Sequence, residues 1–127
     1  MIGLLDTHTL MWWDSDDTKL SPTAKAFIED PGNVILISVV SVWEIVIKSQ
    51  LGKLPMSKPL DHLIADQLAN GLQLLPVTLD HVFAVRPLPS PHKDPFDRLL
   101  VAQAIAERAV LVSADPVFAG YPVTVVW

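Results

Sequence analysis

Several acidic residues that are far apart in the chain each stand beside a segment that should be buried. Asp6 and Asp115 directly follow short apolar runs. Glu44 interrupts an apolar helical segment, and Asp94 and Asp97 open another. Carboxylates are costly to hold near an apolar interior unless a cation compensates their charge. The sequence therefore predicts a bound metal ion and, with it, metal-dependent phosphate chemistry.

Short apolar segments alternate with helical ones, which predicts an α/β fold. Strands that are apolar along their whole length indicate a parallel sheet covered by helices on both faces. The expected strands are 2–5, 34–37, 72–75, 110–112 and 123–126. The expected helices are 7–13, 22–29, 39–51, 59–69, 79–85 and 96–108. We expect the helix over 39–51 to be buried nearly all round, and an irregular proline-rich loop over 86–95.

The predicted sheet offers one place where the acids can meet. Ligands of open parallel sheets bind beyond the carboxyl ends of the strands, where the strand order reverses. Asp6 and Asp115 follow the first and the fourth strand. If these two strands are neighbours, both carboxylates face one crevice, and Glu44 and Asp97 can reach the same edge from their helices.

Two of these acids also have simple structural explanations. Asp6 could cap the helix that follows it. Glu44 could complete a capping box with Ser41, which lies three residues earlier, or form an ion pair with Lys48 one turn later. These alternatives remain open at the level of the sequence.

The other acids have capping roles as alternatives. Asp94 and Asp115 are each followed by proline, the pattern of an N-cap residue before a proline at the first helical position. Asp97 lies in the first turn of the same helix as Asp94, where the helix dipole favours an acid in any case. The prediction of a shared site therefore depends on several acids converging, and no single residue decides it.

Composition limits the kind of protein this is. The 127 residues are most simply one domain, and half of them are hydrophobic, with a mean hydropathy of +0.39. No apolar run approaches the roughly 18 residues of a membrane span, so we expect no membrane role and assign the apolar excess to a core or a partner interface. The absence of cysteine and of an export signal favours the reducing cytoplasm. The net charge of −5 means that binding a nucleic acid requires a local basic rim or bound cations.

Four segments together resemble the PIN domain, and in particular the VapC-type toxins of bacterial toxin–antitoxin systems. The most specific of them is the block His92-Lys93-Asp94-Pro95-Phe96-Asp97-Arg98-Leu99-Leu100 and the Ala- and Gln-containing helix after it. The resemblance covers essentially the whole chain, and the order and spacing of all four segments carry it. The segments are 4–8, 38–45, 92–104 and 111–115.

This resemblance implies a three-layer α/β domain over residues 1–127, with a parallel five-stranded sheet in the order 3-2-1-4-5. It implies an endoribonuclease that uses Mg²⁺ or Mn²⁺ and leaves 5′-phosphate and 3′-hydroxyl ends. It also implies a homodimer and a small antitoxin protein that covers the site. The catalytic and metal-binding acids carried over by motif are Asp6, Glu44, Asp97 and Asp115, with Asp94, Ser113 and Thr7 in supporting roles.

A mechanism follows as a hypothesis from this set of oxygen ligands. Hard divalent cations relieve the repulsion between clustered carboxylates. One cation would lower the pKa of a bound water, and a second, about 4 Å away, could stabilise the leaving oxygen. Candidates for a basic, substrate-facing rim are Lys48, Arg86, Lys93 and Arg98, for each of which simple surface solvation is the alternative.

Two other classes of protein remain as alternatives. Phosphoaspartate proteins also use an aspartate at the end of a parallel strand, but His8 stands where a dehalogenase-type site would need a second aspartate. A non-catalytic interaction domain would use the same acids only as helix caps. Binding of Mn²⁺ would separate the nuclease from the interaction domain.

Overall fold

The computed structural model describes residues 1–89 and 93–127, and its sheet confirms the expected topology. All strand pairs are parallel, in the order β3-β2-β1-β4-β5. The central strand β1 pairs with both β2 and β4, so the chain reverses its direction of winding there. The strands are β1 (Ile2–Leu5), β2 (Val34–Ser38), β3 (Gln73–Leu75), β4 (Val110–Val112) and β5 (Val125–Val126).

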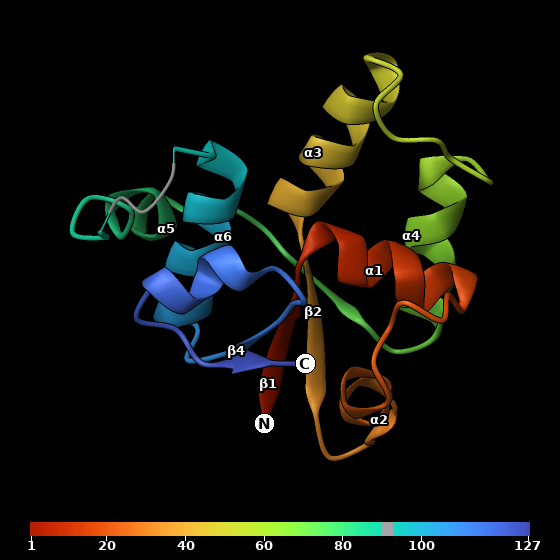
Figure 1. The fold of residues 1–127 in the computed structure, drawn as a ribbon, viewed down its shortest axis with the longest axis horizontal. Helices are drawn as coiled ribbons and strands as arrows, with labels where there is room; N and C mark the ends of the chain where they lie inside the picture. Colours follow the sequence, from red (N-terminus) through yellow and green to blue (C-terminus); the bar gives the residue numbers. More distant parts are fainter. Residues whose placement is uncertain (90–92) are drawn as a thin grey trace.

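Helices cover both faces of the sheet and make three layers (Figure 1). Neighbouring residues of a strand point to opposite faces, so Leu4 packs into one core cluster and Leu5 into the other. The cluster around Leu5 lies under α1 (Thr7–Ser15), α2 (Pro22–Glu29), α3 (Val39–Gln50) and α4 (Leu60–Ala69). The cluster around Leu4 lies under α6 (Pro95–Ala106) and the 3₁₀ helix η1 (Pro116–Gly120), beside the short α5 (Leu79–Phe83).

Several element ends differ from the sequence-based expectation by a few residues. Helix α6 ends at Ala106 instead of 108, because Arg108 takes a left-handed φ of 53° and the Ala109 amide bonds back to the Ala104 carbonyl at 2.8 Å. Strand β5 contains only Val125 and Val126. The expected irregular loop is confirmed at 86–89 and 93–94, while 90–92 lie outside the described residues.

Helix α3 is not buried all round, and that expectation was wrong. Its inner face holds Val40 and Ile45 against the core, but Trp43 is 57% exposed, and Val39 and Val46 on the same side are also exposed. The apolar pattern indicates how many hydrophobic residues the helix has. It does not indicate that the neighbouring elements cover only one side of the helix.

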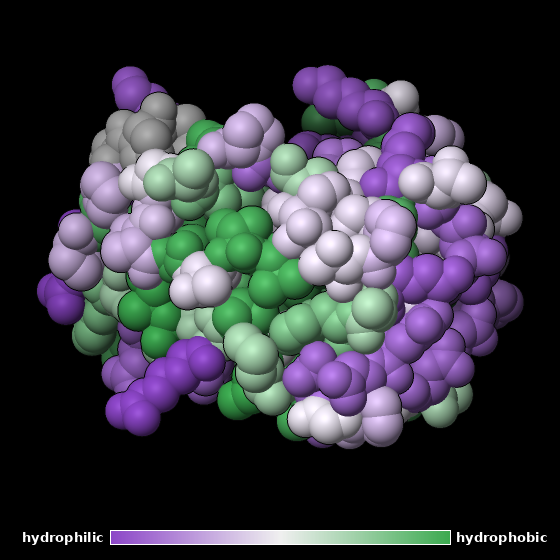
Figure 2. Space-filling view, turned by 60° about the horizontal axis from the view of Figure 1, so that its bottom comes forward, coloured by the Kyte–Doolittle hydropathy of each residue, from purple (hydrophilic) through white to green (hydrophobic). Residues whose placement is uncertain are grey.

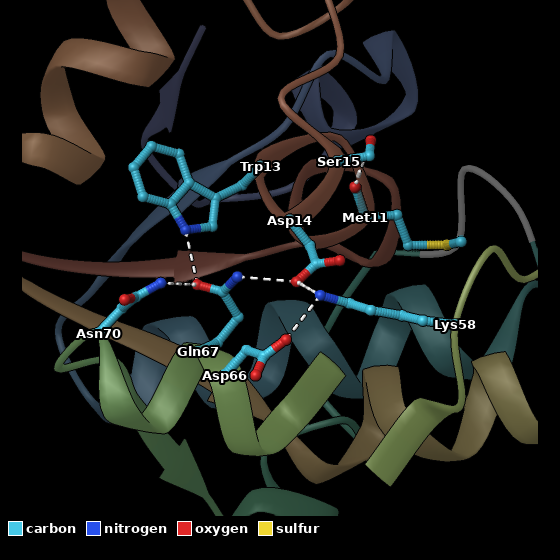
Figure 3. Close-up of polar contacts among 8 residues, drawn as sticks. All are labelled: Met11, Trp13, Asp14, Ser15, Lys58, Asp66, Gln67 and Asn70. Atoms are coloured by element: carbon cyan, nitrogen blue, oxygen red, sulfur yellow. Dashed lines mark hydrogen bonds and ion pairs between the residues drawn. The ribbon is translucent and has the colours of Figure 1, made fainter. Parts of the chain in front are cut away.

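A polar network joins the C-terminal part of α1 to α4 (Figure 3). Asp14 Oδ1 accepts hydrogen bonds from Gln67 Nε2 and from the Lys58 ammonium, each at 2.9 Å. Lys58 also binds Asp66 at 2.8 Å, and the Trp13 indole donates to Gln67 Oε1 at 2.8 Å. Hydrogen bonds to Asp66 and Asp14 raise the pKa of Lys58 above its usual value. The network holds α4 against α1.

Part of the apolar excess lies on the surface. Figure 2 shows hydrophobic residues gathered on the face turned toward the viewer, next to strongly hydrophilic surface. Met1, Val34 and Val125, at or near the beginning of strands, are among the exposed apolar side chains. Among residues 1–89 and 93–127, no helix is long and apolar enough to cross a membrane.

Candidate active site

Asp6 lies directly after β1 and caps helix α1. Its Oδ1 accepts a hydrogen bond from the Thr9 amide at 2.9 Å, and its Oδ2 accepts one from the Ser113 hydroxyl. The residue is only 7% exposed. Capping therefore uses one carboxylate oxygen, and the other points across the end of the sheet toward the residues that follow β4.

Ser113 connects Asp6 to Asp115 beyond the end of β4. Its buried hydroxyl donates to Asp6 and accepts a hydrogen bond from the Asp115 amide at 3.0 Å. Asp115 itself is exposed, and its Oδ1 accepts from the Val117 amide at 3.0 Å as the cap of η1. The capping alternative for Asp115 is thus real, although the residue also reaches the acidic site.

Glu44 is 6% exposed, and internal donors hold both of its oxygens. Oε1 accepts a hydrogen bond from the Thr7 hydroxyl, and Oε2 binds the Lys48 ammonium at 2.6 Å. The ion pair with Lys48, one of the two structural alternatives, is therefore present.

The capping box with Ser41 was wrong. The cap of α3 is Ser38, whose hydroxyl accepts from the Val40 amide at 3.0 Å, so Ser41 already lies inside the helix. Within the described part of the chain, the buried Ser41 hydroxyl has no hydrogen-bond partner. The helix begins earlier than the capping-box pattern suggested, because a serine directly at the end of β2 caps it first.

Asp94 begins helix α6, as the Asp-Pro pattern predicts. Its Oδ1 accepts from the amides of Phe96 and Asp97 at 2.9 and 3.1 Å. Asp97 lies in the first turn of the same helix and is half-buried. Both acids thus stand at a helix N-terminus, where the backbone dipole favours negative charge.

These acids from four separate parts of the chain line one small cavity of about 110 Å³. It lies beyond the carboxyl ends of β1 and β4, the place where parallel sheets bind ligands. Sequence reasoning left His8 without a site, yet it lines this cavity; its only signal was its place two residues after Asp6. The lining residues are Asp6, Thr7, His8, Glu44, Lys48, Asp94, Asp97 and Asp115.

Lys48 is the basic candidate that the structure brings into the acidic cavity. Its hydrogen bond to Glu44, followed by the negative charges of Glu44, Asp94 and Asp97, raises the pKa of Lys48, although partial burial opposes this shift. The surrounding acids therefore stabilise the charged ammonium.

The other rim candidates lie elsewhere. Arg86, Lys93 and Arg98 line a separate cavity of about 490 Å³ between α5 and α6. Arg98 Nη1 donates to the Pro89 carbonyl at 2.6 Å and lies 3.4 Å from the Tyr121 hydroxyl. These contacts direct the Arg98 guanidinium toward its own protein.

The donor atoms of the acidic cavity suit a hard divalent cation. Carboxylate and hydroxyl oxygens, without any thiolate, are the ligands that Mg²⁺ and Mn²⁺ prefer. Among residues 1–89 and 93–127, however, no three acidic or histidine side chains are already arranged to hold a metal ion. In the structure, Lys48 and Thr7 contact the oxygens of Glu44, and Ser113 contacts one oxygen of Asp6.

Comparison with known proteins gives an independent view of the chain. The model of the PIN domain family matches residues 3–123. Ribonuclease VapC22 of Mycobacterium tuberculosis is 28% identical over 113 residues, which cover 88% of this chain and 85% of that protein. Ribonuclease VapC16 of the same organism is 37% identical over 57 residues, 45% of this chain and 40% of that protein.

Solved structures share the fold. VapBC2 from Rickettsia felis, solved bound to a DNA fragment from its promoter, superposes with a TM-score of 0.72 at 19% identity, covering 98% of this chain and 97% of that chain. FitAcB from Neisseria gonorrhoeae superposes with a TM-score of 0.58 at 18% identity, covering 98% and 96%. At such low identity these likenesses concern the fold alone.

Proposed function

The chain belongs to the PIN domain family, and on this premise we propose that it is a metal-dependent endoribonuclease and the toxin of a toxin–antitoxin pair. The observation that carries the proposal is the cavity, in which acids from four parts of the chain meet beyond the ends of β1 and β4. The names of the curated relatives, both VapC ribonucleases, support the same activity.

In the proposed reaction, RNA is cut to leave 5′-phosphate and 3′-hydroxyl ends. Bound Mg²⁺ or Mn²⁺ would supply a water of lowered pKa and would offset the developing negative charge on the phosphodiester. Asp6, Glu44, Asp97 and Asp115 would hold the cation. A cation in this position also reverses the local field, so an acidic cavity can accept an anionic substrate.

The neighbours of these acids have positioning roles in this proposal. The Ser113 hydroxyl fixes one oxygen of Asp6, and the Thr7 hydroxyl fixes one oxygen of Glu44. Such hydrogen bonds orient carboxylate ligands. Asp94 is occupied as the cap of α6, so its support is the placement of Asp97 at the start of that helix.

The proposed partners are RNA as substrate, a second copy of the chain and an antitoxin protein, and the proposed location is the cytoplasm. The solved relatives include VapBC2 of Rickettsia felis and VapBC-1 of Haemophilus influenzae, and a toxin–antitoxin complex from Klebsiella pneumoniae also has this fold.

The test is cleavage of RNA by the purified chain in the presence of Mn²⁺, with Asp6→Asn as the decisive variant. The variant should lose at least the roughly 10–100-fold that is typical when even an indirect metal-site residue is changed. Asp16→Asn is the matched control, because Asp16 is an exposed acid at the other end of α1, and asparagine suits its left-handed backbone. Full activity of Asp6→Asn would refute the role of this residue, and sequencing the cut ends would test the products.

Asp94 and Asp97 are separated by a second pair of variants. Asparagine at position 94 can still cap α6, so Asp94→Asn should keep both the fold and most of the Mn²⁺ affinity. Asp97→Asn should lose Mn²⁺ affinity, measured by calorimetry. Loss only in Asp94→Asn would reverse the assignment of the direct ligand, and no Mn²⁺ binding by the wild type would favour the non-catalytic interaction domain.

A further inference from the structure

The ion pair between Lys48 and Glu44 lies inside the cavity where the proposed metal would bind. The Lys48 ammonium binds Oε2 of Glu44 at 2.6 Å, while Thr7 donates to the other oxygen. Glu44 is almost fully buried, so its carboxylate does not gain equivalent partners from bulk water. In the structure, Glu44 thus already has a cation, supplied by its own helix one turn later.

The ammonium cannot share its position with a metal ion. A divalent cation bound to Glu44 needs a carboxylate oxygen, and the oxygen that is not held by Thr7 is the one that Lys48 binds. An ammonium group beside that cation would also be repelled by its charge. The metal ion and the Lys48 ammonium therefore compete for the same oxygen of Glu44.

The side chain of Lys48 has a way out of the cavity. It is 35% exposed, whereas that of Glu44 is 8% exposed. A lysine has a long flexible stem that can place its ammonium in water while the carboxylate stays in place. Displacement of Lys48 therefore requires a change of side-chain conformation and no movement of α3.

We propose that Lys48 is a built-in competitor of the divalent cation: its ammonium neutralises Glu44 in the metal-free protein and must leave when the metal binds. The proposal rests on the proposed function, because it assumes that the acidic cavity binds a metal. It adds that the chain weakens its own metal affinity and in return neutralises part of the acid cluster when no metal is bound.

The first test is calorimetric titration of the metal-free chain with Mn²⁺ alone. Lys48→Met should bind Mn²⁺ about two- to five-fold more tightly than the wild type, because the competing ion pair is partly exposed and of modest strength. Lys48→Arg keeps the charge and should stay within about two-fold of the wild type. Lys58→Met removes the lysine of the α1–α4 network and should leave the Mn²⁺ affinity unchanged.

The second test is thermal unfolding with a chelator and with saturating Mn²⁺. Lys48→Met should melt at a lower temperature than the wild type in the chelator. Saturating Mn²⁺ should raise its melting temperature by more than it raises that of the wild type. Lys58→Met should melt lower by the same amount in both conditions, since its carboxylates lie away from the cavity. If Lys48→Met does not fold without metal, Lys48→Gln replaces it in both tests.

The outcomes separate this inference from the proposed function. Equal or weaker Mn²⁺ binding by Lys48→Met and Lys48→Gln would overturn the inference, since it would make Lys48 a residue that only positions Glu44. Tight binding of Mn²⁺ by the wild type in that same experiment would leave the proposed function intact. If neither the wild type nor the variants bind Mn²⁺, the proposed function and the inference both fail.

Discussion

Two lysines of this molecule bind carboxylates in similar ways, but the charged residues around them differ. Lys58 lies between Asp14 and Asp66, and Gln67 donates a further hydrogen bond to Asp14 (Figure 3). Lys48 binds Glu44 in a cavity whose described lining also holds four other acids. Both lysines have a raised pKa because they donate to carboxylates.

The difference lies in the balance of charge and of hydrogen-bond donors. Around Lys58 two carboxylates share one ammonium, and Asp14 also accepts from Gln67, so this cluster holds two helices together. Around Lys48 the described acids outnumber the described cations, so the cluster is compensated only in part. An acid surplus that is held in place by its own structure is the condition under which an outside cation binds. Pairing with a lysine is thus no sign of a purely structural acid.

The acidic cavity and the α1–α4 network should differ most in their effect on RNA cleavage when one negative charge is removed from each. Glu44→Gln should lower RNA cleavage by about 100-fold or more, beyond the 10–100-fold typical of indirect metal-site residues. It should leave stability near the wild-type value, because the amide oxygen can still accept from Lys48. Asp14→Asn, the matched variant in the α1–α4 network, should keep its activity per folded molecule. Equal loss of activity in the two variants would contradict the distinction between a catalytic cavity and a structural network.

The α1–α4 network should respond in stability and not in metal binding. Gln67→Ala removes the buried partner of both Trp13 and Asp14, which should lower the free energy of unfolding by about 1–3 kcal/mol. Urea denaturation with and without Mn²⁺ measures this loss, and the loss should be the same in both. A loss that Mn²⁺ restores would link this network to the acidic cavity.

Two buried hydroxyl groups near the end of β4 give a closer comparison. Ser113→Ala removes the donor to Asp6 and should weaken Mn²⁺ binding by about ten-fold. Thr9→Val removes a hydroxyl that donates to the Val112 carbonyl at 2.9 Å, and it should lower stability without changing Mn²⁺ affinity. Calorimetry gives the Mn²⁺ affinity of each variant, and thermal unfolding gives its melting temperature. Unchanged Mn²⁺ binding in Ser113→Ala would mean that Asp6 needs no such orientation.

The smallest effect is expected at Asp115, which is exposed and caps η1. Asp115→Asn keeps a capping oxygen for the Val117 amide and removes only the charge, so it should weaken Mn²⁺ binding a few-fold at nearly unchanged stability. Asp115→Ala removes both and should also lower stability by about 1 kcal/mol. If Asp115→Asn binds Mn²⁺ like the wild type, this acid is a cap and nothing more.

Much of the fold could be predicted because the signals that produce it are local. The apolar strands, the Ser-Pro and Asp-Pro helix starts and the five-stranded parallel sheet are all found in the structure. The ends of the elements could not be predicted, because they depend on left-handed residues such as Arg108. The exposure of α3 could not be predicted either, because it depends on which side of the helix other elements cover.

For the site, the sequence by itself determined which residues are acidic and that these stand at a strand end, at a helix start or, for Glu44, inside a helix. Tertiary structure alone decided that Ser113 donates to Asp6 although 107 residues separate them, and that Thr7 donates to Glu44, 37 residues further along the chain. It also placed Arg98 at another cavity, although it follows Asp97 in the chain. The physical reason is that helix caps and strand patterns depend on near neighbours. Which charges compensate one another depends on the strand order, which brings distant segments to one edge of the sheet.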